Sequence, residues 1–212
     1  MKRADLAGGL LTALLVWMVV YPIAVVARDA TLGGGGALGE FVSRPAEWRV
    51  LWASVWTSLA SVALAGSIGI PLAFLFEWLD FPGRKTLGAL VALPVVLPPL
   101  VGVIAFLFLY GESGFVARAV QAALRVPHAP WQLHGAGAIL LVHAYSFYVY
   151  FYLLTRAGLA KLDASMLEAA EALGAGRLRA LGRVVLPLVR PSLIGASLLT
   201  FMAALGSFSA PF

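Results

Sequence analysis

The sequence predicts an all-α integral membrane protein, a bundle of about five transmembrane helices. Of its 212 residues, 61% are hydrophobic and 12% are charged, and the mean hydropathy is +0.93. Soluble domains carry about 25% charged residues, and a helix needs about 20 apolar residues to cross a membrane. Five apolar windows have this length, so we treat 1–212 as a single transmembrane domain. The expected spans are 6–27, 53–76, 87–110, 136–157 and 191–212.

The chain contains no cysteine, which excludes disulfides, zinc–thiolate sites and thiol nucleophiles. Its net charge of +5 does not indicate a nucleic-acid partner, because the basic residues lie between apolar spans, where membrane topology accounts for them. The three histidines are scattered, and no acidic residue pairs with them in the sequence. We therefore expect no metal site and rank a membrane enzyme lowest among the functions considered.

The first two spans are bounded by recognisable flanks. The first span follows a short basic N-terminus and exceeds the roughly 7–15 apolar residues of a signal-peptide core, so we expect a retained helix. The second begins among three tryptophans at four-residue spacing, which is typical of a membrane interface. Small residues recur along it, mostly four apart, and would let another helix approach closely.

The third span contains Pro94, Pro98 and Pro99 near its middle, followed by Gly102. A proline inside a helix removes a backbone donor, and broken backbone at membrane depth is tolerated only where protein or an aqueous cavity covers it. We therefore interpret this segment as a candidate for pathway lining or gating. The alternative is a kink that only shapes helix packing.

The fourth span contains His143 among tyrosines and phenylalanines. An ionisable residue inside a span is a candidate pathway residue. A hydrogen bond to a neighbouring helix explains it as well, and we favour this packing role. Ahead of this span, the apolar spacing at 115–124 predicts a helix along the outer surface.

The basic residues are distributed unevenly between the two sides of the predicted bundle. With the N-terminus placed inside, the inner segments hold ten of the 15 Lys and Arg residues and the outer segments hold five. Because an excess of Lys and Arg marks the cytoplasmic side, we expect a cytoplasmic N-terminus. The loop 158–190 then also lies in the cytoplasm.

That loop contains the one long polar passage that can form helices. Ser165 and Glu168 have the spacing of a capping box, and Gly174 is the residue expected just past the end of the helix. A basic segment beginning at Arg177 follows. Pro187 then bends or ends the next helix, because it lacks a backbone donor.

Residues 168–187 read Glu-Ala-Ala, three residues, Gly, nine residues and Val-Val-Leu-Pro. This spacing resembles the EAA loop of the membrane subunits of binding-protein-dependent type I ABC importers, with Val184 where that pattern usually has isoleucine. Residues 93–102 and 109–114 resemble the iron(III)-type permeases within that family. One more span and a tail follow the fifth span in the family, so we expect an incomplete core or the first part of a longer permease.

The resemblance implies a permease subunit in the bacterial inner membrane that forms the translocation pathway. A separate ABC ATPase would bind and hydrolyse ATP, so the chain is expected to have no cofactor and no enzymatic activity of its own. The resemblance assigns contact with that ATPase to Glu168, Ala169, Ala170, Gly174, Arg177, Leu186 and Pro187.

The other implied partners are membrane lipid, a periplasmic or lipoprotein substrate-binding protein, and a second permease unit, identical or fused. Ferric iron is the implied cargo, with thiamine, polyamine, sulfate, molybdate and aminoethylphosphonate as rivals. The alternative function is a secondary transporter or channel that works without an ATPase. That alternative predicts polar groups at mid-membrane to bind coupling ions, and apart from His143 the spans have almost none.

Overall fold

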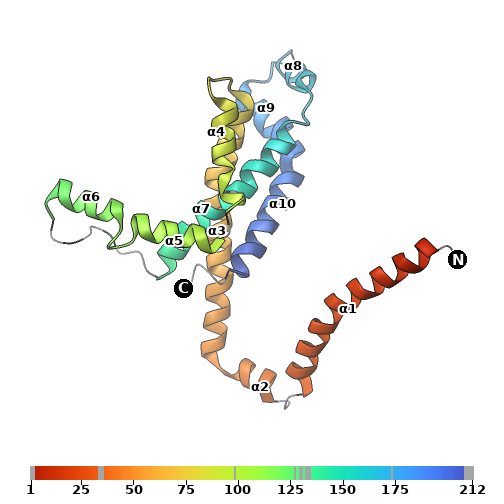
Figure 1. Ribbon diagram of the computed structural model, residues 1–212. Coiled ribbons are helices and arrows are strands. Elements are labelled where there is room, and N and C mark those ends of the chain that lie inside the picture. Colours follow the sequence, from red (N-terminus) through yellow and green to blue (C-terminus); the bar gives the residue numbers. More distant parts are fainter. Residues whose placement is uncertain are drawn as a thin grey trace. The chain divides into compact units, whose positions relative to one another are not determined.

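The computed structural model describes residues 3–32, 36–97, 99–126, 128, 131, 135–172 and 174–207. Within these residues the chain is helical and contains no strand, as predicted (Figure 1). The chain divides into two compact units, 1–53 and 54–212, which are considered separately. The prediction of a single transmembrane domain over 1–212 stays a prediction.

The first unit contains α1 (Arg3–Leu32), α2 (Gly36–Ser43) and the start of α3 (Pro45–Trp78). The stretch Gly8–Asp29 of α1 is long and apolar enough to cross a membrane, and within the first unit none of its described residues is buried. Trp17 and Tyr21, one turn apart, stack with ring centroids 5.0 Å apart. A helix that is apolar on all sides and unburied is suited to contact with lipid or another subunit.

The second unit contains the rest of α3 and all later helices. In chain order these are α4 (Arg84–Val91), a 3-10 turn η1 (Leu93–Val95), α5 (Pro99–Tyr110), α6 (Phe115–Leu124), α7 (Gly135–Leu159), α8 (Ala164–Ala172), α9 (Arg177–Ala180), a π-helical turn η2 (Leu181–Val185) and α10 (Leu186–Leu205). Across the two units, the described residues supply five stretches able to cross a membrane.

Helices α3, α7 and α10 form the core of this unit. Ala65 of α3, Phe147 and Phe151 of α7, and Ala196 and Ala204 of α10 are buried together. Small residues allow the helices to come this close. The small face predicted on the second span is therefore used for packing, and Ala196 and Ala204 have the same role on α10.

Two glycines mark the closest helix crossings. A Cβ atom on Gly69 would lie 2.3 Å from the carbonyl oxygen of Tyr148, so α3 and α7 touch at their backbones there. A Cβ atom on Gly158 would lie 2.7 Å from both Ser192 Oγ and Val189 Cγ1. Neither crossing could form at the same separation with a larger residue.

The third expected span, 87–110, is broken near its middle, as its prolines predict. Helix α4 ends at Val91, a single 3-10 turn follows, and α5 begins at Pro99. The break follows from the prolines, which lack an N–H group and disfavour helical backbone in the residue before them. The apolar stretch able to cross runs later, at Val101–Leu124, through α5 and α6. Pro98 lies outside the described residues.

The helices of the other spans begin earlier than predicted, while α10 ends at Leu205, short of the expected 212. Residues 208–212 lie outside the described residues. Helix α3 starts at Pro45, ahead of the expected 53, and α10 starts at Leu186, ahead of the expected 191. Pro191 therefore lies inside a helix. Transmembrane helices tolerate internal proline because neighbouring groups and local changes of hydrogen-bond register satisfy the freed carbonyls.

Candidate functional site

The polar loop between α7 and α10 begins with a capped helix. The Ser165 amide donates to Asp163 Oδ1 over 3.0 Å, so Asp163 caps the N-terminus of α8. The predicted capping box, which placed Ser165 in this role, is off by two residues. Both residue types are good N-caps, and the sequence alone did not distinguish them. The same hydrogen bond lowers the pKa of the exposed Asp163 carboxyl below its ordinary value.

Gly174 ends the same helix in the way the sequence predicts. Its φ angle is +77°, a left-handed conformation that favours glycine. The Ala175 amide donates to the Ala170 carbonyl over 3.0 Å. Of the two hydrogen bonds in a Schellman motif, this is the one that spans more residues. Nothing lies within 4 Å of a Cβ built on Gly174, so backbone conformation alone requires glycine here.

Helix α8 has one face toward the bundle and one toward solvent. Leu167 packs against a buried cluster of Leu159, Val185 and Val189, which joins the end of α7 to η2 and α10. Glu168 and Ala169 are exposed, and Ala170 is half-buried. Glu168 and Ala169, two of the seven predicted coupling residues, thus lie on the exposed side of a helix that is anchored through Leu167.

The last three predicted coupling residues lie where the loop joins α10. Arg177 begins α9, and Leu186 and Pro187 are the first two residues of α10. The π-turn between them closes when the Leu186 amide donates to the Leu181 carbonyl, five residues back. Pro187 does not end the helix. The hydrogen-bond spacing changes from four residues to five in the π-turn just before it. The backbone from α9 to α10 is therefore helical throughout.

The broken third segment is held by two tyrosines of α7. The Tyr148 hydroxyl donates to the Val91 carbonyl over 2.7 Å, at the last residue of α4. The Tyr152 hydroxyl donates to the Gly88 carbonyl over 3.4 Å. These contacts satisfy carbonyls near the break. The sequence signal was a pair of tyrosines four residues apart, since a buried tyrosine hydroxyl needs a partner.

A small pocket lies beside this break. Its volume is about 170 Å³, and it brings Pro94 and Gly102, two of the predicted pathway residues, against Tyr145 and Tyr150 of α7. Pro99 starts α5. A role for these residues in the pathway stays a prediction.

His143 lies elsewhere, in the packed interface between α7 and α3. It is buried, and its Nδ1 atom is 2.8 Å from Ser61 Oγ. Within the described residues its Nε2 atom has no hydrogen-bond partner. The interhelical hydrogen bond that we favoured from sequence is present, and His143 does not line the pocket beside the break.

An ion-pair network near the C-terminal end of α7 was not predicted. Arg156 Nε donates to Glu77 Oε2 over 3.1 Å, and Arg84 Nη1 donates to Asp80 Oδ1 over 2.5 Å. Arg84 also approaches Glu77, at 3.9 Å. The sequence did contain a signal for this network. Residues of opposite charge flank apolar spans on the side that the distribution of Lys and Arg predicts to be cytoplasmic. Together these residues fix the ends of α3, α4 and α7 to one another.

Comparison with known proteins identifies the family. The family described as "Binding-protein-dependent transport system inner membrane component" matches residues 66–211. The chain belongs to this family. The match includes the broken segment, the α8 loop and α10, the elements that carry the predicted site.

Curated relatives agree with this family. The molybdenum transport system permease protein ModB of Escherichia coli is 33% identical over 75% of this chain and 69% of its own length. A probable ABC transporter permease protein of Sinorhizobium fredii is 30% identical over 97% of this chain. The thiamine transport system permease protein ThiP of Brucella abortus is 31% identical over 96% of this chain. The chain spans 36% and 37% of the lengths of the last two.

A solved structure has the same fold. A bacterial alginate ABC transporter in complex with an alginate pentasaccharide-bound periplasmic protein matches 94% of this chain and 72% of the other, with a TM-score of 0.75 at 16% identity. This likeness confirms the helical arrangement. The predicted family and all-α membrane fold are therefore confirmed, and no finding supports specificity for iron.

Proposed function

We propose that the chain is a permease unit of an ATP-driven importer, in which it forms part of the translocation pathway and couples to a separate ATPase. The observation that carries the proposal is the structure of α8. Leu167 fastens one face to the ends of α7 and α10, while Glu168 and Ala169 are exposed on the helix surface. A rigid element of this kind can be seated in a groove of a partner and transmit its movement.

Each predicted coupling residue has a physical role in this proposal. Glu168 offers a charge to a basic residue of the ATPase, and Ala169 and Ala170 keep the docking face narrow. Gly174 allows the sharp turn after α8. The continuous helix from Arg177 through Leu186 and Pro187 then carries the displacement into α10.

The proposed partners are ATPase subunits, a substrate-binding protein and a second permease unit. The alginate ABC transporter, solved with a periplasmic protein, supports the first two by analogy of fold. The chain spans about a third of ThiP but 69% of ModB, so the second unit is either fused to it or separate. In this arrangement the N-terminus and the α8 loop are cytoplasmic, as the distribution of Lys and Arg favours.

The cargo we propose is a small polar solute. Relatives named for transport of molybdenum, thiamine and 2-aminoethylphosphonate support this class. Ferric iron, which the sequence resemblance favoured, has no support among them. The rival function, a transporter or channel without an ATPase, is disfavoured by the family to which the chain belongs.

Substitutions on α8 test the coupling role. We expect Glu168→Lys to abolish uptake and co-purification of the ATPase, because it reverses the proposed docking charge, and Glu168→Gln to weaken both. Gly174→Ala should also impair uptake, since a left-handed conformation costs a residue with a Cβ about 1–2 kcal/mol. The matched control is Gly176→Ala, two residues on, where glycine has neither a positive φ nor a crowded Cβ.

The measurements are uptake in membrane vesicles and pull-down of the ATPase, with membrane insertion checked by blotting. Undiminished uptake and ATPase association in both Glu168→Lys and Gly174→Ala would exclude docking through α8. Equal losses in Gly174→Ala and Gly176→Ala would show that the turn conformation is not what matters.

A further inference from the structure

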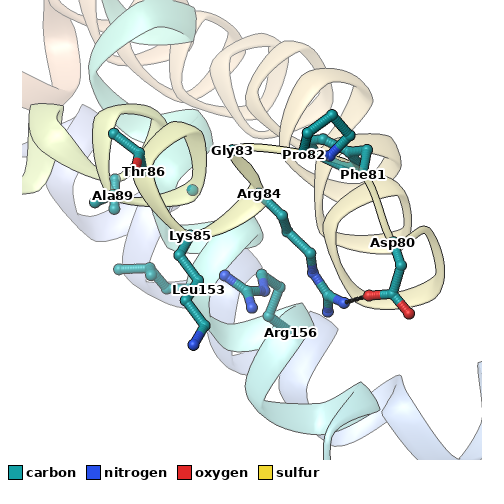
Figure 2. A pocket seen from close by; sticks show the side chains of 12 residues that line it. Asp80, Phe81, Pro82, Gly83, Arg84, Lys85, Thr86, Ala89, Leu153 and Arg156 are labelled. Atoms are coloured by element: carbon teal, nitrogen blue, oxygen red, sulfur yellow. Dashed lines mark hydrogen bonds and ion pairs between the residues drawn. The ribbon is translucent and has the colours of Figure 1, made fainter.

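A large pocket lies between the C-terminal end of α7, which carries Arg156, and the turn that joins α3 to α4. Its volume is about 1080 Å³. Three cationic side chains line it, Arg84 and Lys85 from the start of α4 and Arg156 from α7 (Figure 2). Among the described residues of its lining, Asp80 is the one that is acidic. We call this site the basic pocket.

The cations of the basic pocket are not all neutralised by the protein. Arg84 pairs with Asp80, and Arg156 pairs with Glu77. Lys85 is exposed, and no carboxylate of the described residues forms an ion pair with it. These five groups therefore carry a net charge of +1, which matches an anion with a single negative charge.

Apart from Thr86, the rest of the described lining consists of apolar residues and glycine. Ala89 and Ala92 line the pocket from α4, and Leu153 lines it from α7, one turn before Arg156 (Figure 2). Trp78, the last residue of α3, is about half exposed close to the pocket in sequence. Tryptophan at the end of a span is typical of the lipid headgroup level.

We propose that the basic pocket binds an anionic membrane lipid, with its phosphate at Lys85 and Arg156 and its acyl chain along Leu153. Basic pockets between transmembrane helices on the cytoplasmic side suit such headgroups. Lys85 provides the uncompensated charge, and Arg156 offers a planar guanidinium suited to phosphate oxygens. A free inorganic anion would use the charged end alone and would gain nothing from the apolar wall.

Native mass spectrometry of the transporter, purified from membranes with its partner subunits, tests this site. The probes are phosphatidylglycerol, which is anionic, and phosphatidylcholine, which has no net charge. We compare wild type with Lys85→Gln and with the control Lys161→Gln, another exposed lysine that lies outside the pocket. Lys85→Gln should weaken phosphatidylglycerol binding about five-fold, the effect of about 1 kcal/mol per basic residue near a membrane surface.

Lys161→Gln should leave phosphatidylglycerol binding unchanged, and phosphatidylcholine binding should be equal in all three proteins. Equal phosphatidylglycerol binding by wild type and Lys85→Gln would overturn the proposal. Displacement of the lipid by an equal concentration of inorganic phosphate would assign the pocket to a free anion and overturn it too. The readout needs neither cargo nor ATP, so failure of the importer proposal and failure of this one are separately visible.

Discussion

The crossing of α3 and α7 at Gly69 can be tested by adding one methyl group. In Gly69→Ala the new Cβ would lie 2.3 Å from the Tyr148 carbonyl oxygen, 2.6 Å from Phe151 Cβ and 3.0 Å from the Tyr152 amide nitrogen. Ordinary contacts begin near 3.4 Å, so the two backbones must separate by about 1 Å. Overpacking of this kind costs about 1–3 kcal/mol, and contact with backbone atoms favours the upper end.

Gly66 provides a matched control one turn earlier on α3. Its added Cβ would lie 3.4 Å from two ring carbons of Phe151, which is ordinary contact. Replacing glycine by alanine inside a helix otherwise adds about 0.5–1 kcal/mol of stability. Gly66→Ala should therefore be neutral or stabilising, whereas Gly69→Ala should be destabilising.

Unfolding in mixed detergent micelles, followed by circular dichroism, measures the free energy of unfolding of the two variants. We expect Gly69→Ala to lose about 1–3 kcal/mol relative to wild type, with Gly66→Ala at or above the wild-type value. Equal stability of the two variants would show that α3 and α7 are not in backbone contact, and would refute the crossing geometry.

Two further predictions concern hydrogen bonds. Tyr148→Phe should lower the free energy of unfolding by about 1 kcal/mol through loss of the bond to the Val91 carbonyl. Tyr145→Phe, whose hydroxyl has no such bond within the described part of the chain, should change it less in the same assay. The reverse order would contradict the anchoring role of Tyr148. The bond from the Ser165 amide to Asp163 should persist at neutral pH and be lost as pH falls through the lowered pKa of that carboxyl, below its ordinary 3.8. The chemical shift of the Ser165 amide, followed by NMR as the pH is lowered, measures this loss. A titration midpoint at or above 3.8, or the same pH-dependent change in Asp163→Ala, would contradict the cap.

Features determined by local chemistry were predictable from the sequence. The glycine turn after α8 followed from its position behind a short helix, and Gly174 has the expected positive φ. The break in the third segment followed from its prolines, because proline acts on the residues beside it. The apolar windows likewise predicted five stretches able to cross a membrane.

Features determined by contacts between distant residues were not predictable. Glu77 and Arg156 are 79 positions apart, and no spacing rule relates them. Tyr148 reaches a carbonyl 57 positions away. Two helix starts were misplaced for other reasons. The cap of α8 is Asp163 and not Ser165, because several residue types satisfy the same capping rule. Helix α10 starts at Leu186, because Pro191 is tolerated inside a transmembrane helix.

Cross-linking tests most directly whether α8 contacts the ATPase. Because the chain has no cysteine, a single cysteine can be introduced without removing others. We expect Ala169→Cys, on the exposed surface of α8, to cross-link to the ATPase in membranes. Ser43→Cys, exposed at the end of α2 on the predicted outer side, should not. A cross-link from Ser43→Cys, or none from Ala169→Cys in an assembled and active transporter, would contradict docking of the ATPase on α8.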